Sequence, residues 1–188
     1  MSNLDTRRRI EGVVFFVAFA CTIPLANWLI GNVGTVCVPD GPCLIPVAPG
    51  IVAPSGVLAI GAGLVLRDLV QRRLGLLWSF AAIAIGAILS FFFAPPALVI
   101  ASTVAFALSE TADLLVYTPL QRRGLVLAAF ASSVVGLVID SIVFLTLAFG
   151  SLDLLPGQVI GKFWMVLAAL PVLAWIRSRD RRVGMVPA

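Results

Sequence analysis

Six long apolar stretches, separated by short polar turns, constrain the fold of this chain more than any other feature. A bilayer core about 30 Å thick needs about 20 apolar residues for each helical crossing. Stretches of this length predict helices over residues 10–31, 51–71, 74–93, 96–118, 124–149 and 156–176. The sequence therefore predicts an all-α integral membrane protein, with six transmembrane helices in a single domain that spans residues 1–188.

The composition excludes a water-soluble fold. Of the 188 residues, 61% are hydrophobic and 12% are charged, and the mean hydropathy is +1.10. A soluble domain of this size would expose a large apolar surface. The net charge is +4, but the arginines occur in short clusters between apolar stretches rather than along one face. We therefore expect the lipid bilayer as a partner and no nucleic acid.

The arginines also predict how the helices are oriented. They precede the first apolar stretch, occupy the turns at residues 71–73 and 121–123, and follow the last stretch, whereas the opposite loops carry only Asp40 and Asp153. Loops with an excess of arginine stay in the cytoplasm. The pattern predicts a multi-pass protein with both termini in the cytoplasm.

Two features of the first long loop, a pair of cysteines and a proline-rich segment, each allow two interpretations. The spacing of Cys37 and Cys43 is compatible with a disulfide if the loop faces an oxidising compartment, and the alternative is two free thiols. The segment 46–56 holds three prolines and two glycines, too many helix breakers for a regular helix. It either dips into the membrane and lines a cavity, or forms an ordinary surface loop.

Polar side chains inside the apolar stretches form two layers. The layers, outer first, are Asn27, Asp140 and Lys162, and then Arg67, Asp68, Glu110 and Asp113. Ionisable groups in hydrocarbon are costly, so they face the bundle interior, pair with one another or line a pathway. One interpretation is a substrate cavity bordered by charged gates. The alternative is ion pairs that only hold helices together, Lys162 with Asp140 and Arg67 with Glu110 or Asp113. We expect Arg67 and Asp68 to be the weakest site candidates, because an arginine near a helix end can snorkel into the headgroups.

Residue spacing places several of these groups on helix faces. The faces are Phe106, Glu110, Asp113 and Tyr117; Ser133, Gly136, Asp140 and Phe144; and Ala18, Thr22 and Ala26. The first face is expected to look inward. The small residues of the other two favour close approach of a neighbouring helix, or of a partner protein in the case of Ala18, Thr22 and Ala26.

The chain lacks the residues of several function classes. It contains no histidine, which removes the commonest metal ligand and the commonest general base. It has no GxxxxGK[ST] motif, so energy for transport would come from an ion gradient, a partner ATPase or metabolic trapping. We therefore expect no catalytic residue, no metal site and no cofactor, and a protein that is not an enzyme.

Two stretches on consecutive predicted helices carry a family resemblance. Residues 109–117, SETADLLVY, and residues 132–144, SSVVGLVIDSIVF, are joined across the Arg122-Arg123 turn. They resemble the paired signatures of the vitamin uptake transporter family, also called the queuosine precursor transporter family. The resemblance covers about residues 51–149. The chain departs from the family in its short length and in residues 67–70, where Asp68 keeps an acidic residue but the following turn differs.

The resemblance implies a small bacterial inner-membrane protein that is similar in fold to the substrate-binding subunits of energy-coupling-factor transporters. It implies import of a 7-deazaguanine base used to make queuosine, such as 7-cyano-7-deazaguanine, by secondary or facilitated transport. The alternatives are a binding subunit that needs an ATPase module, docked on the Ala18, Thr22 and Ala26 face, and a membrane assembly factor whose polar layers only pack. A coupling ion remains open, and nothing demands more than a monomer.

The chemistry of a purine-like base indicates which residue types would bind it. A carboxylate accepts two parallel N–H bonds from the pairing edge of such a base, and aromatic side chains stack on its flat face. Depth favours Glu110 or Asp140 over Asp113 as this carboxylate. The candidate substrate-binding residues are Glu110, Asp140, Asp113, Asn27, Phe106, Tyr117, Phe144, Lys162 and Trp164.

Overall fold

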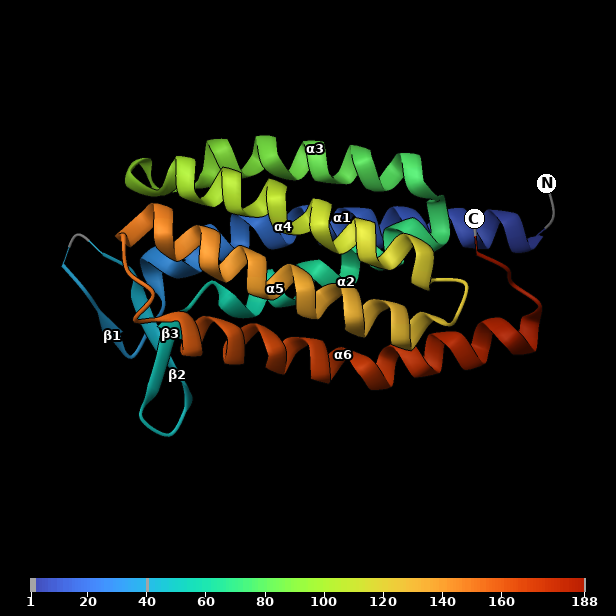
Figure 1. The fold of residues 1–188 in the computed structure, drawn as a ribbon. Coiled ribbons are helices and arrows are strands. Elements are labelled where there is room, and N and C mark those ends of the chain that lie inside the picture. Colours follow the sequence, from blue (N-terminus) through green and yellow to red (C-terminus); the bar gives the residue numbers. More distant parts are fainter. Residues whose placement is uncertain (1–2, 40, 188) are drawn as a thin grey trace.

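Six long helices run back and forth along one axis, with residues 33–56 joining the first two and short turns joining the others (Figure 1). The computed structural model describes residues 3–39 and 41–187, so Asp40 lies outside the described residues. The helices are α1 Asn3–Asn32, α2 Val57–Leu74, α3 Leu76–Phe93, α4 Val99–Leu120, α5 Leu125–Phe149 and α6 Leu155–Val183, with a short 3-10 turn, η1, at Pro96–Leu98. The six predicted helices are thereby confirmed.

The helix α2 differs from its neighbours because it is polar. In the described residues, five helices are long and apolar enough to cross a membrane, namely α1, α3, α4, α5 and α6. The 18-residue helix α2 carries Arg67, Asp68, Arg72 and Arg73, and it contacts all five other helices. These charged side chains are buried by protein rather than exposed to lipid, as an intramembrane charge requires.

The second helix begins at Val57, so the prediction that it begins at residue 51 is wrong. Residues before it form a three-stranded antiparallel sheet of β1 Val36–Cys37, β2 Cys43–Ala48 and β3 Ile51–Pro54, in the order β1-β2-β3. The prolines of segment 46–56 exclude helix but are tolerated in these short strands. Gly50, with φ of 71°, makes the tight turn between β2 and β3. The segment is therefore a hairpin at one end of the bundle (Figure 1). Its last residues, Pro54 and Gly56, line an interior pocket, as the cavity interpretation of this segment expected.

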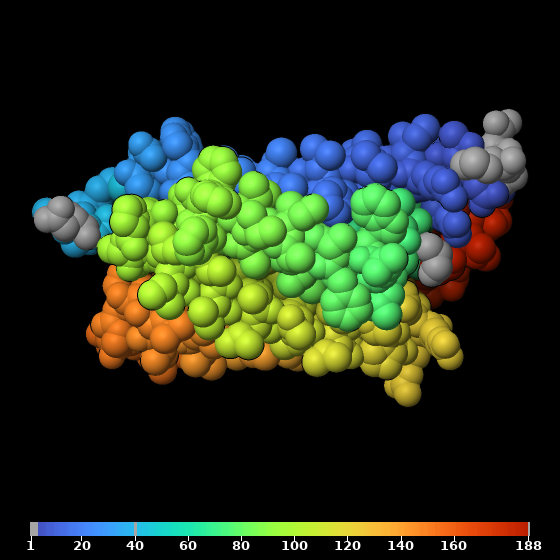
Figure 2. Space-filling view, turned by 90° about the horizontal axis from the view of Figure 1, so that it is seen from above, coloured from blue at the N-terminus to red at the C-terminus, as the bar shows by residue number. Residues whose placement is uncertain are grey.

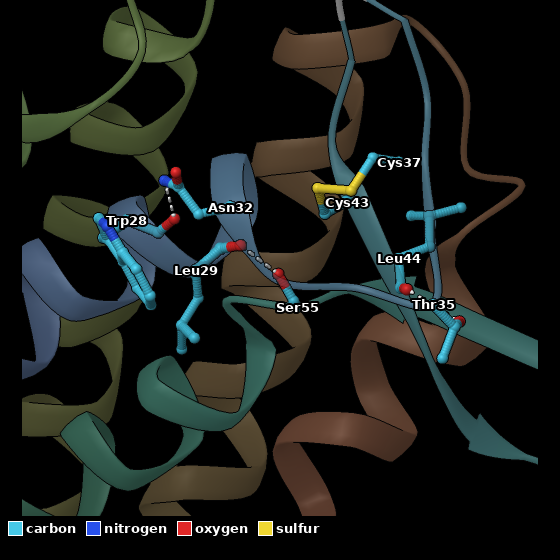
Figure 3. The surroundings of a disulfide bond; sticks show 8 residues. All are labelled: Trp28, Leu29, Asn32, Thr35, Cys37, Cys43, Leu44 and Ser55. Atoms are coloured by element: carbon cyan, nitrogen blue, oxygen red, sulfur yellow. Dashed lines mark hydrogen bonds between the residues drawn. A yellow bond between two sulfur atoms is a disulfide. The ribbon is translucent and has the colours of Figure 1, made fainter.

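A disulfide joins Cys37 and Cys43, so the first of the two interpretations of this pair is confirmed (Figure 3). It links β1 to the start of β2. Ser55 Oγ donates a hydrogen bond of 2.7 Å to the backbone oxygen of Leu29, which ties the end of the sheet to the end of α1 (Figure 3). Cys21, in α1, is the free cysteine of the described chain.

The two ends of the bundle differ in charge. The start of α1, the end of α6, and the α2–α3 and α4–α5 turns lie together at one end, which we call the arginine end (Figure 1). The sheet, η1 and the α5–α6 turn lie at the opposite end, which we call the sheet end (Figure 1). Each arginine-bearing terminal segment and turn is therefore at the same end, as the charge pattern predicted.

The outer surface is apolar where lipid would contact it. Figure 2 shows one face of the molecule, with α3 between α1 and the α4–α5 pair. On α3 the side chains of Leu77 and Phe92 are 79% and 74% exposed, among a run of other exposed apolar residues. An exposed apolar surface of this extent is what a membrane-spanning bundle presents to lipid tails.

Small residues bring α1, α2 and α6 into close contact. A Cβ added at Gly63 would lie 3.0 Å from Thr22 Oγ1, and one at Gly56 would lie 2.8 Å from the backbone oxygen of Ala26. Thr22 and Ala26 are buried and therefore receive α2, which is the neighbouring-helix interpretation of this face.

The contact between α2 and α6 at Gly61 gives a stability prediction. A Cβ there would lie 2.6 Å from the backbone oxygen of Lys162, which cannot move aside without shifting α6. We expect Gly61→Val to destabilise the purified protein by about 2 kcal/mol, the usual cost of overpacking. Thermal unfolding in detergent measures this.

The matched control is Gly31→Val, because no atom lies within 4 Å of a Cβ added at Gly31. Equal melting temperatures for the two variants would contradict the close packing of α2 on α6.

Candidate functional site

A pocket lies inside the bundle toward the sheet end. Every long helix contributes to its lining. The lining is mainly apolar, with a few polar groups. The polar side chains are Asn27, Ser90, Ser102, Asp140, Gln158 and Lys162, and the aromatic ones are Phe106 and Phe144. Concave sites that combine apolar walls with a few polar groups are typical of small-molecule binding.

The charged group in the pocket is an ion pair between α5 and α6. Lys162 Nζ donates to Asp140 Oδ2 at 2.6 Å and to Ser141 Oγ at 2.8 Å. Ser109 Oγ, from α4, donates to Asp140 Oδ1 at 3.5 Å. Lys162 is 1% exposed and Asp140 7% exposed. The predicted pair is confirmed, and it both holds two helices together and forms part of the pocket wall.

The lining also includes an amide and two aromatic rings. Asn27 Nδ2 donates to the backbone oxygen of Ile23 at 2.9 Å, so its side-chain oxygen is left as an acceptor. Phe106 packs on Phe19 with ring centroids 6.0 Å apart, and Phe144 packs edge-on against Phe149 at 5.9 Å. These contacts fix the two pocket phenylalanines in place as flat apolar walls.

The second polar layer is built around Arg67, whose side chain is fully buried. Its Nε donates to Glu110 Oε2 at 3.2 Å, and its Nη1 donates to Gln71 Oε1 at 3.1 Å. Its Nη2 lies 2.8 Å from Asp68 Oδ1 and also donates to Asp113 Oδ1. We call Arg67, Asp68, Glu110 and Asp113 the Arg67 cluster. The expectation that Arg67 snorkels is wrong, because three carboxyl groups hold it in the interior.

The Tyr117 ring packs against the guanidinium group of Arg67. Its centroid is 5.7 Å from the Arg67 guanidinium carbon, a cation–π distance. The predicted face of Glu110, Asp113 and Tyr117 therefore looks inward, but onto Arg67, and none of the three lines the pocket.

The predicted candidates thus divide into three groups. Asn27, Phe106, Asp140, Phe144 and Lys162 meet in the pocket, and Glu110, Asp113 and Tyr117 meet at Arg67. Trp164 joins neither group, since it is 53% exposed and its Nε1 donates to the backbone oxygen of Val47 in β2 at 3.0 Å. Trp164 follows Lys162 by two residues, and each residue of a helix is rotated by about 100° from the one before it. Trp164 therefore lies on the opposite side of α6 from Lys162 and points away from the pocket.

Three polar pocket residues were missed from the sequence. Ser90 lies near the end of the apolar helix α3, Ser102 near the start of α4, and Gln158 on α6. Gln158 carried a usable signal, because it precedes Lys162 by four residues and so shares its helix face. A single serine in an apolar helix carries no such signal.

A third charged group closes the arginine end. Asp180, on α6, accepts hydrogen bonds from Arg72 and Arg73, with distances of 2.8 to 3.1 Å. Glu11, on α1, lies 3.0 Å from Arg73 Nε and accepts from Arg179 at 2.5 Å. This arginine-end network joins α1, α2 and α6. The pocket is therefore separated from the arginine end by two layers of paired charges.

The comparison with protein families identifies the chain. The model of a family described as "Putative vitamin uptake transporter" matches residues 57–176. The chain belongs to this family. The match runs from the start of α2 into α6, so it includes the Arg67 cluster and the Asp140–Lys162 pair.

Membership of the vitamin uptake transporter family confirms the resemblance inferred from residues 109–117 and 132–144, and it makes the protein a multi-pass membrane transporter of a vitamin-like substrate. Asn27 and the sheet lie outside the matched residues. No match was found among curated proteins or among solved structures.

The buried ion pair gives a second stability prediction. Lys162→Met leaves the Asp140 carboxyl buried without its counter-ion, and removal of one partner of such a pair costs about 3 kcal/mol or more. We expect a clear fall in the melting temperature in detergent for this variant.

Lys162→Met combined with Asp140→Asn removes both charges and serves as the control. We expect the double variant to recover at least half of the loss, because no unpaired charge remains. Additive losses in the double variant would show that the two side chains are not coupled.

Proposed function

We propose that this protein imports a 7-deazaguanine queuosine precursor, 7-cyano-7-deazaguanine or a related base, across the bacterial inner membrane by secondary or facilitated transport. The base would be moved without chemical change. The single observation that carries the proposal is the pocket, in which a carboxylate–ammonium pair and two phenylalanine rings line a space suited to a flat polar molecule. Family membership supports transport of a vitamin-like substrate.

The pocket matches the hydrogen-bonding pattern of such a base. A guanine-type pairing edge presents two adjacent N–H donors, which one carboxylate accepts in parallel. Asp140 is the pocket carboxylate, and its Oδ1 is held only by Ser109 at 3.5 Å. The neighbouring carbonyl oxygen of the base would accept from Lys162 Nζ or from the amide of Gln158, which also line the pocket. Phe106 and Phe144 would contact the ring faces.

We propose that the sheet end faces the outside of the cell and the arginine end faces the cytoplasm. Arginine-rich turns and termini are retained on the cytoplasmic side. The disulfide at the sheet end supports the same orientation independently, because disulfides persist in oxidising compartments. The pocket would then receive the base from outside.

Labelling with a membrane-impermeant maleimide tests the orientation. In a Cys21→Ser background, we expect Leu152→Cys, at the α5–α6 turn, to be labelled in intact cells, and Arg123→Cys, at the α4–α5 turn, only after permeabilisation. Both positions are exposed on the surface. The reverse pattern would invert the assignment of the two ends.

Uptake in cells tests the substrate. Cells that lack queuosine synthesis and their own importers are given the free base, and queuosine in transfer RNA is measured. We expect the wild-type protein to restore queuosine and Asp140→Asn to reduce uptake by at least tenfold, because the amide cannot accept both N–H bonds. Asp153→Asn, at the exposed α5–α6 turn, should behave as wild type. No rescue despite normal expression would exclude this substrate.

The same variants separate transport from a packing role and from dependence on an ATPase. If Asp140→Asn changed only the melting temperature and left binding of the base intact, the polar layer would serve packing, as in an assembly factor. We propose uptake without an ATPase module, a choice supported by the burial of Thr22 and Ala26 against α2. Uptake that vanishes in cells without such modules would favour the binding-subunit alternative.

A further inference from the structure

The Arg67 cluster is a second polar site, distinct from the pocket. None of its four members lines the pocket, which ends at Phe106 on α4. Asp113 follows Phe106 by seven residues, or about 10 Å along the helix axis toward the arginine end. The cluster therefore lies between the pocket and the arginine-end network, in the region that a transported molecule or an accompanying ion would pass.

The charges of the cluster do not balance. One guanidinium faces three carboxyl groups, and two of these, Asp68 and Asp113, converge on the same nitrogen, Nη2 of Arg67. Arg67, Asp68 and Asp113 are 0% exposed and Glu110 is 3% exposed. With all three carboxyls ionised, two negative charges would remain uncompensated in the interior, where each costs several kcal/mol. Neighbouring carboxyls in such a site share protons instead of ionising together.

Unpartnered oxygens beside the cluster give independent support. Asp113 Oδ2 has no hydrogen-bond donor, and the hydroxyls of Tyr117 and Ser133, both 0% exposed, have no partner. Ser133 lies one turn from Gly136 on the same face of α5, and a Cβ at Gly136 would be 3.2 Å from Asp113 Oδ2. Buried polar atoms without partners are rare. A proton on Asp113 Oδ2 would turn this unpartnered acceptor into a donor, which a neighbouring hydroxyl oxygen could accept.

We propose that the Arg67 cluster binds the proton that drives transport, so that the base enters together with protons moving down their gradient. This inference rests on the proposed function. A proton fits the site better than a metal cation, because the Arg67 guanidinium occupies the centre and repels a cation. The proton would bind a cluster carboxyl from the sheet-end side and be released to the arginine-end side. No covalent bond of the base changes.

The surrounding charges define the path of the proton. From α2 the facing groups are Arg67 and Asp68, with Arg72 one turn further along; from α4 they are Glu110, Asp113 and Tyr117. On the pocket side, α5 and α6 contribute Asp140 and Lys162, and on the arginine-end side α6 contributes Asp180, which pairs with Arg72 and Arg73. The helix α3 carries no charged residue. Glu110 is the cluster member closest to the pocket along α4, because it follows the pocket residue Phe106 by four residues, or about one helical turn. Occupation of the pocket can therefore influence proton binding at the cluster.

Transport by purified protein in liposomes tests the coupling. With labelled 7-cyano-7-deazaguanine and an inward proton gradient, we expect the wild type to concentrate the base and a protonophore to abolish this. Asp113→Asn and Glu110→Gln should lose at least tenfold in accumulation but keep exchange of labelled for unlabelled base, because exchange requires no net proton movement. Wild-type transport that ignores the gradient, or variants that still accumulate the base, would overturn the proton site.

A spectroscopic measurement tests the site without a substrate. Infrared difference spectra of the purified wild type should contain the C=O stretch of a protonated, buried carboxyl at neutral pH, and Asp113→Asn should remove or shift it. Asp153→Asn, at an exposed turn, is the control and should retain the band. Absence of the band in the wild type would overturn the proposal. If the wild type moved no base at all, the proposed function would fail, and this spectrum alone would decide the proton site.

Discussion

The structure depends on the enclosure of one polar helix. Charged side chains of α2 cannot face lipid without a cost of several kcal/mol each. The five apolar helices therefore surround it, and four of them supply polar partners: carboxyls from α4 at Arg67, a serine from α5 at Asp68, and carboxylates from α1 and α6 at Arg73. The pocket lies where α2 carries no charge, between its first turns and the sheet-end halves of the other helices.

Three polar layers along one axis give the molecule a direction. The pocket contains one balanced ion pair, the Arg67 cluster contains more carboxyls than cations, and the arginine-end network contains more arginines than carboxylates. A molecule that leaves the pocket toward the arginine end has to pass the Arg67 cluster and then the arginine-end network. Its passage requires the ion pairs of both layers to break, and both layers involve α2. Movement of α2 relative to its neighbours is the simplest change that opens this route, as in other carriers whose helices rearrange around a central site.

Much of this arrangement could be predicted from residue types. Apolar length located six helices. The cost of charge in lipid led to the ion pairs Lys162 with Asp140 and Arg67 with Glu110 or Asp113, and in the structure Arg67 contacts both carboxyls. The depth of a residue along a helix does not show which way its side chain points. Glu110 was therefore proposed as a substrate-binding carboxylate together with Asp140, although it points at Arg67. Trp164 was included among the site residues, although it points outward. The β-hairpin was missed because its proline-rich strands follow no alternating pattern, and its pairing involves contacts between segments that composition does not reveal.

The polarity of α2 has a consequence for how the protein is made. A segment with four charged side chains partitions poorly into lipid when it leaves the insertion machinery alone, because a single arginine or aspartate near the centre can offset several leucines. Gly75 alone separates α2 from the strongly apolar α3. The two helices are therefore suited to enter the bilayer together as one helical hairpin. The apolar α3 would favour insertion of the pair until α4 and α5 are inserted and their side chains pair with the charged groups of α2. Biogenesis of the protein would then be most sensitive to changes that lengthen this one-residue turn.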